Sequence, residues 1–530
     1  MASYCSLLYA GVFLPAVVLC YAVTPQRHRG KVLLAASYLF FWLVSGKLVV
    51  FLLASAFSLH HFGLWLAAVQ EERGRLLAAA DKPERKAIKA AFQRRLRRIL
   101  LFALLLHIGT LLTLKYAAFF SANLNRALEA FRLPFALPVP AFVLPIGISF
   151  YTLQAASYLI DVYRGTVQAD RNPGRLMLFL GFFPQIMEGP ICRYGQTAQA
   201  LWEGRPFTWH DLTFGMQRIL FGMMKKIVIA DRLNILIKGV FSNPAAYDGG
   251  ITALAMVCYT CQLYMEFSGT MDVVIGSAEI FGVRLPENFR QPFFSKSIAE
   301  FWMRWHITLG TWFKDYIFYP LSMSGPLKKL TGAARRRLGN HFGPLLAGSA
   351  ALLAVWLCNG LWHGAGWQYI FFGLYHFALI LCGSLTEPLA RRVAGALHID
   401  RSAAPYRVFR ILRTGLLVCV GELFFRAEGL RAGLSMFRRM VTGFTLRPFT
   451  NGAFLELGMD GHDFFIVAVA VLIVLAVGVL RERGVPLREA LGRQHIAVRW
   501  SVYYAAILFV VIFGAYGVGY VPVDPIYAAF

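Results

Sequence analysis

Apolar runs of about 20 residues recur along the chain, and short polar segments, many of them basic, separate them. A helix of this length crosses the hydrocarbon core of a bilayer. The runs are continuous and do not alternate with polar residues, which argues against a membrane β-barrel. The pattern predicts an all-α polytopic membrane protein with roughly 11–13 membrane segments, some of them broken or re-entrant. The predicted segments are residues 5–23, 31–45, 47–69, 99–120, 138–160, 174–190, 213–240, 250–282, 345–358, 367–383, 406–425, 463–480 and 498–521.

One long apolar run is interrupted by polar and small residues. Residues 345–382 are apolar except for the sequence NGLWHGAG at 359–366, which leaves pieces of 14 and 16 residues on either side. Both pieces are short for a full membrane crossing. Irregular backbone at membrane depth persists only where protein or a water-filled cavity surrounds it. The sequence therefore predicts a polar cavity near His363.

A second unusual stretch is EFWMRWHITLGTWFKDYIFYPL at residues 300–321, which is rich in both charge and tryptophan. Taken as a helix over residues 297–315, it places an aromatic stripe on one face, and this stripe contains one histidine. The members of that face are Ile298, Trp302, Trp305, His306, Leu309 and Phe313. An amphipathic helix at the membrane interface explains the tryptophans. It explains less well why two histidines, His306 and His363, each lie near an interruption of the membrane pattern.

Polar and ionisable residues also form clusters inside apolar segments, where each charge costs a few kcal/mol and indicates a functional site by default. The clusters contain Glu266, Ser268 and Asp272; Arg304, His306, Lys314 and Asp315; and Asn359 and His363. A buried histidine can be neutral at pH 7 and so can accept a proton. A nearby carboxylate or backbone carbonyl could orient it, and the sequence leaves open which group does so.

Composition supports the membrane assignment and narrows the partners. Of the 530 residues, 58% are hydrophobic and only 15% are charged, and the mean hydropathy is +0.56. The net charge of +25 need not indicate nucleic acid, because basic loops on the cytoplasmic side of a membrane explain it. Residues 70–98 carry ten Lys or Arg against four Asp or Glu and are predicted to form such a loop. We expect contact with anionic membrane lipids and no nucleic acid. We also expect no metal, because Cys258-x-x-Cys261 lies in an apolar segment and has no second pair at metal-ligand spacing.

The motifs at these positions resemble the membrane-bound O-acyltransferase family, and within it the bacterial branch for alginate O-acetylation and teichoic-acid D-alanyl transfer. The resemblance covers residues 144–427. The matching sequences include LPIGISFYTLQAASYLIDVYRG (144–165), FFPQIMEGPICRY (182–194), MMKKIVIADRL (223–233), YMEFSGTMDVVIG (264–276), LPENFRQPFF (285–294), FWMRWHITL (301–309), GLWHGAGWQYIFFGLYH (360–376) and LFFRA (423–427). WHITL together with GLWHG is the most specific combination.

The resemblance implies a fold, a reaction and a site. Broken helices would surround a central polar tunnel, through which an acyl group passes from a cytoplasmic thioester to a hydroxyl on the other side. His363 matches the family's catalytic histidine, the general base, and His306 matches a second histidine of the bacterial branch. The residues expected to bind substrate are Asn359, Trp362, Trp302, Trp305, Glu266, Ser268, Asp272 and Asp315.

The expected organisation and partners follow from the same resemblance. Residues 1–143 would form N-terminal membrane helices, 144–427 the catalytic core and 428–530 C-terminal membrane helices, all in a bacterial cytoplasmic membrane. No cofactor would be bound. The donor would be acyl-CoA or an acyl carrier protein, and an extracytoplasmic, hydrolase-like acetyltransferase would complete transfer to an exopolysaccharide or cell-wall glycan. D-alanyl transfer to teichoic acid from a carrier protein is the alternative within the class, and a transporter or flippase and a non-catalytic scaffold are alternatives of other classes.

Overall fold

A computed structural model describes residues 4–516, and the chain in this range folds into two compact units. The first contains residues 4–219 and 274–286, and the second contains residues 220–273 and 287–516. All regular elements in the described range are helical, and strand-like pairing there is limited to one isolated bridge between Phe289 and Trp305. The predicted all-α class is confirmed.

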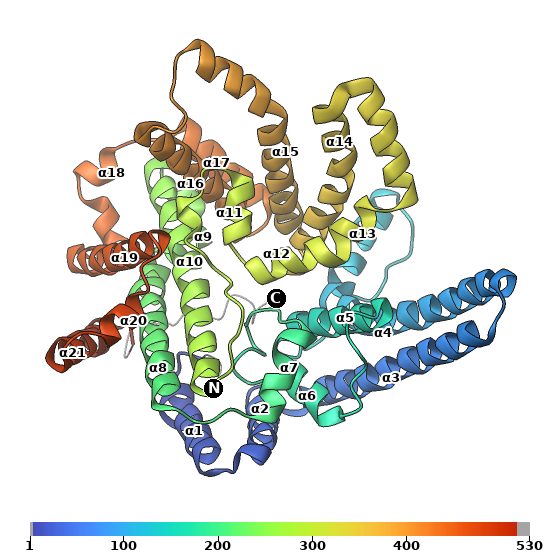
Figure 1. Ribbon diagram of the computed structural model, residues 1–530. Coiled ribbons are helices and arrows are strands. Elements are labelled where there is room, and N and C mark those ends of the chain that lie inside the picture. The colour runs from blue at the N-terminus through green and yellow to red at the C-terminus, as the bar shows by residue number, and fades with distance from the viewer. Residues whose placement is uncertain (1–3, 517–530) are drawn as a thin grey trace. The chain divides into compact units, whose positions relative to one another are not determined.

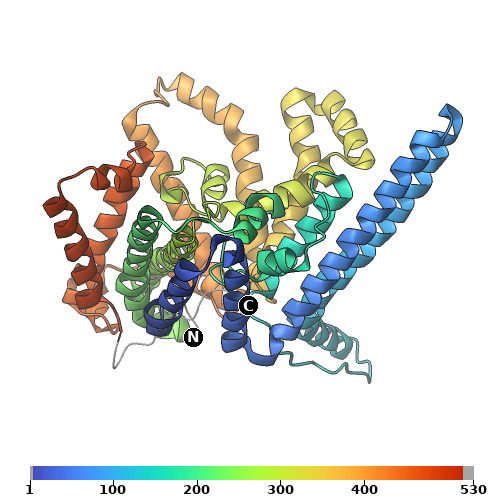
Figure 2. The same ribbon diagram turned by 60° about the horizontal axis from the view of Figure 1, so that its bottom comes forward.

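The first unit begins with short helices and continues into a long antiparallel hairpin. Its elements are η1 (Tyr9–Phe13), α1 (Leu14–Val23), η2 (Gln26–His28), α2 (Arg29–Ser45), η3 (Gly46–Leu48), α3 (Val49–Ala79), α4 (Lys82–Ala130), α5 (Ile148–Arg164), α6 (Pro173–Gly181), α7 (Tyr194–Glu203) and most of α8 (Trp209–Met223). Helices α3 and α4 lie side by side in both ribbon views (Figure 1, Figure 2). The span predicted over residues 174–190 is wrong, because α6 ends at Gly181.

The basic segment 70–98 is helical and not an open loop. It forms the end of α3, a tight connection at Ala80 and Asp81, and the first turns of α4. An exposed ion pair between Arg95 and Glu72, 2.9 Å apart, links the two helices. Such a pair contributes at most about 1 kcal/mol, so the apolar contacts of the hairpin hold the helices together. The positive charge of the segment is unaffected by this correction.

The second unit contains the remaining helices. They are η4 (Met224–Ala230), α9 (Asp231–Ser242), η5 (Pro244–Ala246), most of α10 (Gly249–Ile280), η6 (Pro292–Phe294), α11 (Ile298–Arg304), α12 (Ile307–Phe313), η7 (Lys314–Phe318), α13 (Tyr319–Ser322), α14 (Gly325–His363), α15 (Trp367–Ala396), α16 (Ala404–Arg426), α17 (Leu430–Thr442), α18 (Arg447–Thr450), η8 (Ala453–Glu456), α19 (Gly461–Glu482), α20 (Leu487–Gly492) and α21 (Ile496–Phe513).

Helices α14 and α15 form a close antiparallel pair (Figure 1), and His363 is the last residue of α14, directly before their connection. A Cβ atom on Gly360 would lie 2.4 Å from the Tyr369 carbonyl oxygen, and one on Gly373 would lie 2.4 Å from that of Trp356. Glycine at these two positions lets the backbones approach, as is common where membrane helices cross. The interruption is shorter than predicted, because NGLWH is helical and only Gly364–Gly366 lies between the helices.

The membrane character rests on the length and hydropathy of the helices. Six helical segments in the described range are long and apolar enough to cross a membrane, and one of them, Gln26–Ala79, contains both α2 and α3. The five others are α4, α14, α15, α19 and α21. The expected 11–13 segments also counted shorter and broken pieces. The chain is an all-α polytopic membrane protein.

Candidate active site

The stretch predicted to be one helix over residues 297–315 is two helices, α11 and α12, and that prediction is wrong. Trp305 is extended, and His306 adopts a left-handed conformation with φ 46° and ψ 50°. Few residues other than glycine adopt this conformation, and it is found in turns and at strained functional positions. The aromatic stripe is nevertheless largely buried, and both Trp305 and His306 are in the interior.

Asn288 organises this break between α11 and α12. Its backbone oxygen accepts a hydrogen bond from Ile307 N at 3.0 Å, and its side-chain oxygen accepts from Thr308 N at 3.0 Å and Thr308 Oγ1 at 2.9 Å. The same side-chain oxygen lies 3.3 Å from His306 Nδ1. In the neutral ring this contact favours a proton on Nδ1 and leaves the lone pair on Nε2. The side-chain amide of Asn288 therefore helps to orient His306, whereas the sequence left the orienting group open.

His363 is the last residue of α14 and is buried among aromatic rings. Its ring meets those of Trp362 and Phe425 edge to face, with centroids 5.0 and 5.1 Å apart. The Trp362 ring also contacts the ring of His306, at a centroid distance of 5.5 Å. The two predicted catalytic histidines, which are far apart in sequence, therefore meet at one tryptophan inside the second unit.

Asn359 lies one helical turn before His363 and is also buried. Residues at i and i+4 share one face of a helix. The side-chain oxygen of Asn359 has no hydrogen-bond partner within residues 4–516. Buried polar atoms are rarely left unsatisfied, so this oxygen is available to accept a hydrogen bond from a bound donor such as water or substrate.

His376 extends the aromatic cluster on the α15 side. It is fully buried, and its Nδ1 accepts a hydrogen bond from the Trp302 indole N–H at 3.2 Å. The Phe372 ring contacts both His376 and His363, at centroid distances of 4.6 and 6.0 Å. Trp302 therefore serves to fix α11 against α15, while Trp305 packs on Phe301 and Phe289.

Glu266, Ser268 and Asp272, three predicted substrate-binding residues, each contact a buried lysine. Lys226 Nζ lies 2.8 Å from Glu266 and 2.6 Å from Asp231, while Lys225 Nζ lies 2.5 Å from Asp272 and donates to Ser268 Oγ at 3.1 Å. The lysines belong to the π-helix η4, and Glu266, Ser268 and Asp272 to α10. Removing either partner of a buried pair would leave an uncompensated charge.

Two features of this region were not predicted from the sequence. They are the ionic network around Lys225 and Lys226, and the role of Asn288 at the break between α11 and α12. Lys225 and Lys226 stood in MMKKIVIADRL and Asn288 in LPENFRQPFF, both of which were noted only for their resemblance. Two signals in the sequence could have revealed these features: an asparagine within an apolar and aromatic segment, and two adjacent lysines in a membrane segment. Asp315, the last predicted binding residue, lies half-buried on the π-helical turn η7.

No group of three or more His, Cys, Asp or Glu side chains is arranged to hold a metal ion in the described part of the chain. The side chains that this site offers for chemistry are the imidazoles of His306 and His363 and the amides of Asn288 and Asn359, and aromatic rings surround them. This combination suits the transfer of a proton and the positioning of a hydroxyl.

Comparison with known proteins gives the family. Residues 172–333 match the membrane-bound O-acyltransferase family, MBOAT, in a range that includes His306. A "probable alginate O-acetylase AlgI" of Azotobacter vinelandii is 31% identical over 92% of this chain and 87% of its own length. A peptidoglycan O-acetyltransferase of Helicobacter pylori is 27% identical over 64% of each chain. A teichoic acid D-alanyltransferase of Bacillus subtilis is 32% identical over 46% of this chain and 59% of its own length.

These similarities and the helical architecture define a polytopic membrane acyltransferase. The chain belongs to the membrane-bound O-acyltransferase family, as the resemblance of its motifs predicted.

Proposed function

We propose that this protein moves an acetyl group from a cytoplasmic thioester to a hydroxyl group on the other side of a bacterial cytoplasmic membrane. The observation that carries the proposal is the meeting of His306 and His363, two buried histidines from separate segments, at the ring of Trp362. Ionisable side chains inside the membrane segments of a polytopic chain are rare and indicate a functional site by default. Acyl transfer to a hydroxyl needs the proton acceptor that such a group supplies.

In the proposed reaction His363 is the general base. It takes the proton of the acceptor hydroxyl as the hydroxyl oxygen attacks the thioester carbonyl carbon. The new C–O bond forms, the C–S bond breaks, and the proton passes from His363 to the departing thiolate. A hydroxyl is a weak nucleophile without such help, and general-base catalysis contributes roughly 10²–10⁴ in rate.

His306 has an orienting role in this proposal. The contact of its Nδ1 with Asn288 supports a neutral tautomer whose Nε2 accepts a hydrogen bond. That nitrogen would accept a hydrogen bond from a second, neighbouring hydroxyl of the acceptor, and so hold the reacting hydroxyl, whose proton passes to His363, in line with the carbonyl carbon. Asn359, one turn from His363, carries an amide N–H₂ that would donate to the developing oxyanion.

The choice of acetyl and of a surface glycan rests on relatives. The relative that matches 92% of this chain is named for alginate O-acetylation, and another is named for peptidoglycan O-acetylation. We propose acetyl-CoA as the donor and an extracytoplasmic, hydrolase-like acetyltransferase as the partner that completes transfer. D-alanyl transfer from a carrier protein to teichoic acid is the second candidate, favoured by a relative that matches 46% of this chain.

The test uses proteoliposomes that hold the partner transferase inside and expose the donor face outside. Acetyl-CoA labelled on the acetyl group is added in one arm, and a carrier protein charged with labelled D-alanine in the other. Label reaching the luminal partner or glycan from acetyl-CoA alone supports the proposal, and transfer from the carrier protein alone supports the second candidate. Appearance of intact labelled acetyl-CoA in the lumen would contradict both and indicate a transporter.

A further inference from the structure

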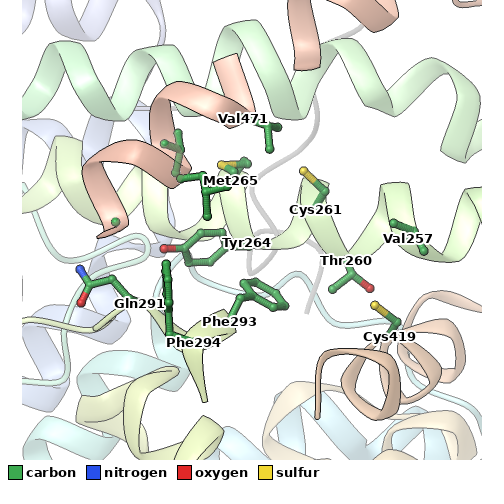
Figure 3. A pocket seen from close by; sticks show the side chains of 13 residues that line it. Val257, Thr260, Cys261, Tyr264, Met265, Gln291, Phe293, Phe294, Cys419 and Val471 are labelled. Atoms are coloured by element: carbon green, nitrogen blue, oxygen red, sulfur yellow. The ribbon is translucent and has the colours of Figure 1, made fainter. Parts of the chain in front are cut away.

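A cavity in the second unit has an almost entirely apolar wall, and neither His306 nor His363 lines it. It has a volume of about 300 Å³ and lies between α10, the 3₁₀ turn η6, α16 and α19. Figure 3 shows Tyr264 and Met265 of α10, Phe293 and Phe294 of η6, and Cys419 of α16 around it. This volume is at the lower end of the range for ligand-binding pockets.

The cavity opens at the outer surface of the apolar helices. Two of its lining residues, Val257 of α10 and Leu475 of α19, are 53% and 49% exposed. Helix α19 has 22 residues and is one of the candidate membrane spans. Its exposed apolar side chains therefore face lipid, and an alkyl chain is the molecule that this opening meets in a bilayer.

The face of α19 that lines the cavity ends at an arginine. Val471, Val474 and Gly478 line the cavity, and Arg481 follows at the next step of the same helical stripe. Arg481 lies in the last turn of α19, where a spanning helix reaches the lipid headgroups. The stripe from Val471 to Gly478 covers about 10 Å of helix, which is within one leaflet of a hydrocarbon core about 30 Å thick.

Near Arg481, at the end of this stripe, several arginines have no carboxylate partner in the described part of the chain. Arg304 is bound by two glutamates, Glu300 and Glu482, each at 2.9 Å. Arg290, Arg481 and Arg483 are exposed, and no carboxylate pairs with any of them within residues 4–516. An anionic headgroup at the interface would complement this cluster.

We propose that the cavity binds one acyl chain of an anionic glycerophospholipid, with the lipid phosphate held by Arg481 and its neighbouring arginines. The occupant is a structural lipid and not the acyl donor. It fills the space between α10 and α19 and packs against Tyr264 and Phe293, whose rings meet at 5.3 Å. Tyr264 in turn contacts Trp305, next to His306, at a centroid distance of 5.9 Å.

The first test measures the lipid that co-purifies with the full chain, by native mass spectrometry after reconstitution with phosphatidylglycerol or phosphatidylcholine of matched chains. Gly478→Leu should place a side chain in the cavity, because a Cβ at Gly478 meets Phe294 at an ordinary 3.4 Å. We expect retained phosphatidylglycerol to fall about tenfold. The matched control, Ala476→Leu, lies on the exposed side of α19 and should retain it in full. Equal retention in the two variants would overturn the proposal.

The headgroup is tested separately. Arg481→Gln should abolish the preference for phosphatidylglycerol over phosphatidylcholine, whereas Arg431→Gln, an exposed arginine on α17, should leave it intact. A preference that survives Arg481→Gln would contradict the assignment of the phosphate site.

A measurement on the unaltered protein covers the case in which the cavity variant does not fold. Cys261 and Cys419 line the cavity, and Cys382 is exposed elsewhere. Phosphatidylglycerol should slow alkylation of Cys261 and Cys419 by a membrane-permeant maleimide about tenfold relative to phosphatidylcholine, with Cys382 unchanged. Equal rates for Cys261 and Cys419 in both lipids would contradict the proposal. None of these readouts depends on acyl transfer.

Discussion

At the scale of single residues, the site depends on how two imidazoles are held. His306 occupies a left-handed backbone position that the side chain of Asn288 stabilises through three contacts from His306 and Thr308. His363 is held by aromatic edges at the end of α14. The Trp362 ring fixes the spacing between them. A small change at Asn288 should therefore alter catalysis even though this residue is not proposed to touch the acyl group.

Asn288→Ala removes the acceptor for both Thr308 donors and for His306 Nδ1. Leaving buried donors unsatisfied costs about 1–3 kcal/mol, and His306 loses the contact that sets its tautomer. We expect a lower apparent Tm and a fall in kcat of roughly 10–10², measured by acetyl transfer in proteoliposomes. Asn243→Ala, at an exposed asparagine, is the control. Full activity of Asn288→Ala would show that the contact with His306 is dispensable.

At the scale of elements, two sets of contacts hold the helices together around the site. The first is the ionic network between η4 and α10, in which Lys226 lies between Asp231 and Glu266. The second is the pair of glycines at the crossing of α14 and α15. For each set of contacts, a substitution tests whether its residues stabilise the fold.

Lys226→Met would leave two carboxylates in the interior without this cation. The expected loss is about 3–5 kcal/mol, observed as a large decrease in the temperature of thermal unfolding in detergent. Adding Glu266→Gln to the same variant should restore part of the loss by removing one of the buried charges. Lys328→Met, at an exposed lysine of α14, should have no effect. A stable Lys226→Met protein would contradict the structural role of the network.

Gly360→Ala tests the crossing of α14 and α15. The added methyl group would meet the Tyr369 carbonyl oxygen at 2.4 Å, so the helices must separate and His363 must move with α14. Overpacking of this kind costs about 1–3 kcal/mol. We expect lower stability and reduced transfer. Gly348→Ala, on the same helix with open space around it, should be neutral or stabilising by about 0.5–1 kcal/mol. If the two variants behave alike, close approach at Gly360 is not required.

At the scale of the whole molecule, the sequence predicted the features that depend on residues close together in the chain. The segments expected at 250–282, 406–425 and 463–480 agree within a few residues with α10, α16 and α19, because an apolar run encodes a helix directly. His306 and His363 were identified as candidates from motifs. Their meeting at Trp362 was not predictable, because it depends on packing between segments far apart in the chain.

The errors have the same physical origin. The break at His306 depends on Asn288, 18 residues away in the chain, and no periodicity within residues 297–315 reveals it. The lysine partners of Glu266 and Asp272 were likewise missed, because those contacts join segments about 40 residues apart in the chain, while the substrate-binding role of the two carboxylates stays a prediction. The segment 70–98 was expected to be a loop because of its charge, although lysine, arginine and glutamate are good helix formers.

The charge of the helical hairpin at 70–98 predicts its side of the membrane. Ten basic residues against four acidic ones should keep it in the cytoplasm. An epitope inserted at the connection between Ala80 and Asp81 should react with antibody only after the cytoplasmic membrane is permeabilised, like a cytoplasmic marker. Reaction in spheroplasts with an intact membrane would reverse the assigned orientation and place the donor face on the other side.

The most direct test of the central claim is the transfer of labelled acetyl groups in proteoliposomes by wild type, His363→Ala and the control His341→Ala, whose histidine is exposed. We expect a fall of roughly 10²–10⁴ in kcat/KM for His363→Ala, with comparable protein in the membrane and near wild-type transfer for His341→Ala. Wild-type transfer by His363→Ala would contradict the claim, because the proton acceptor would then have to be another group.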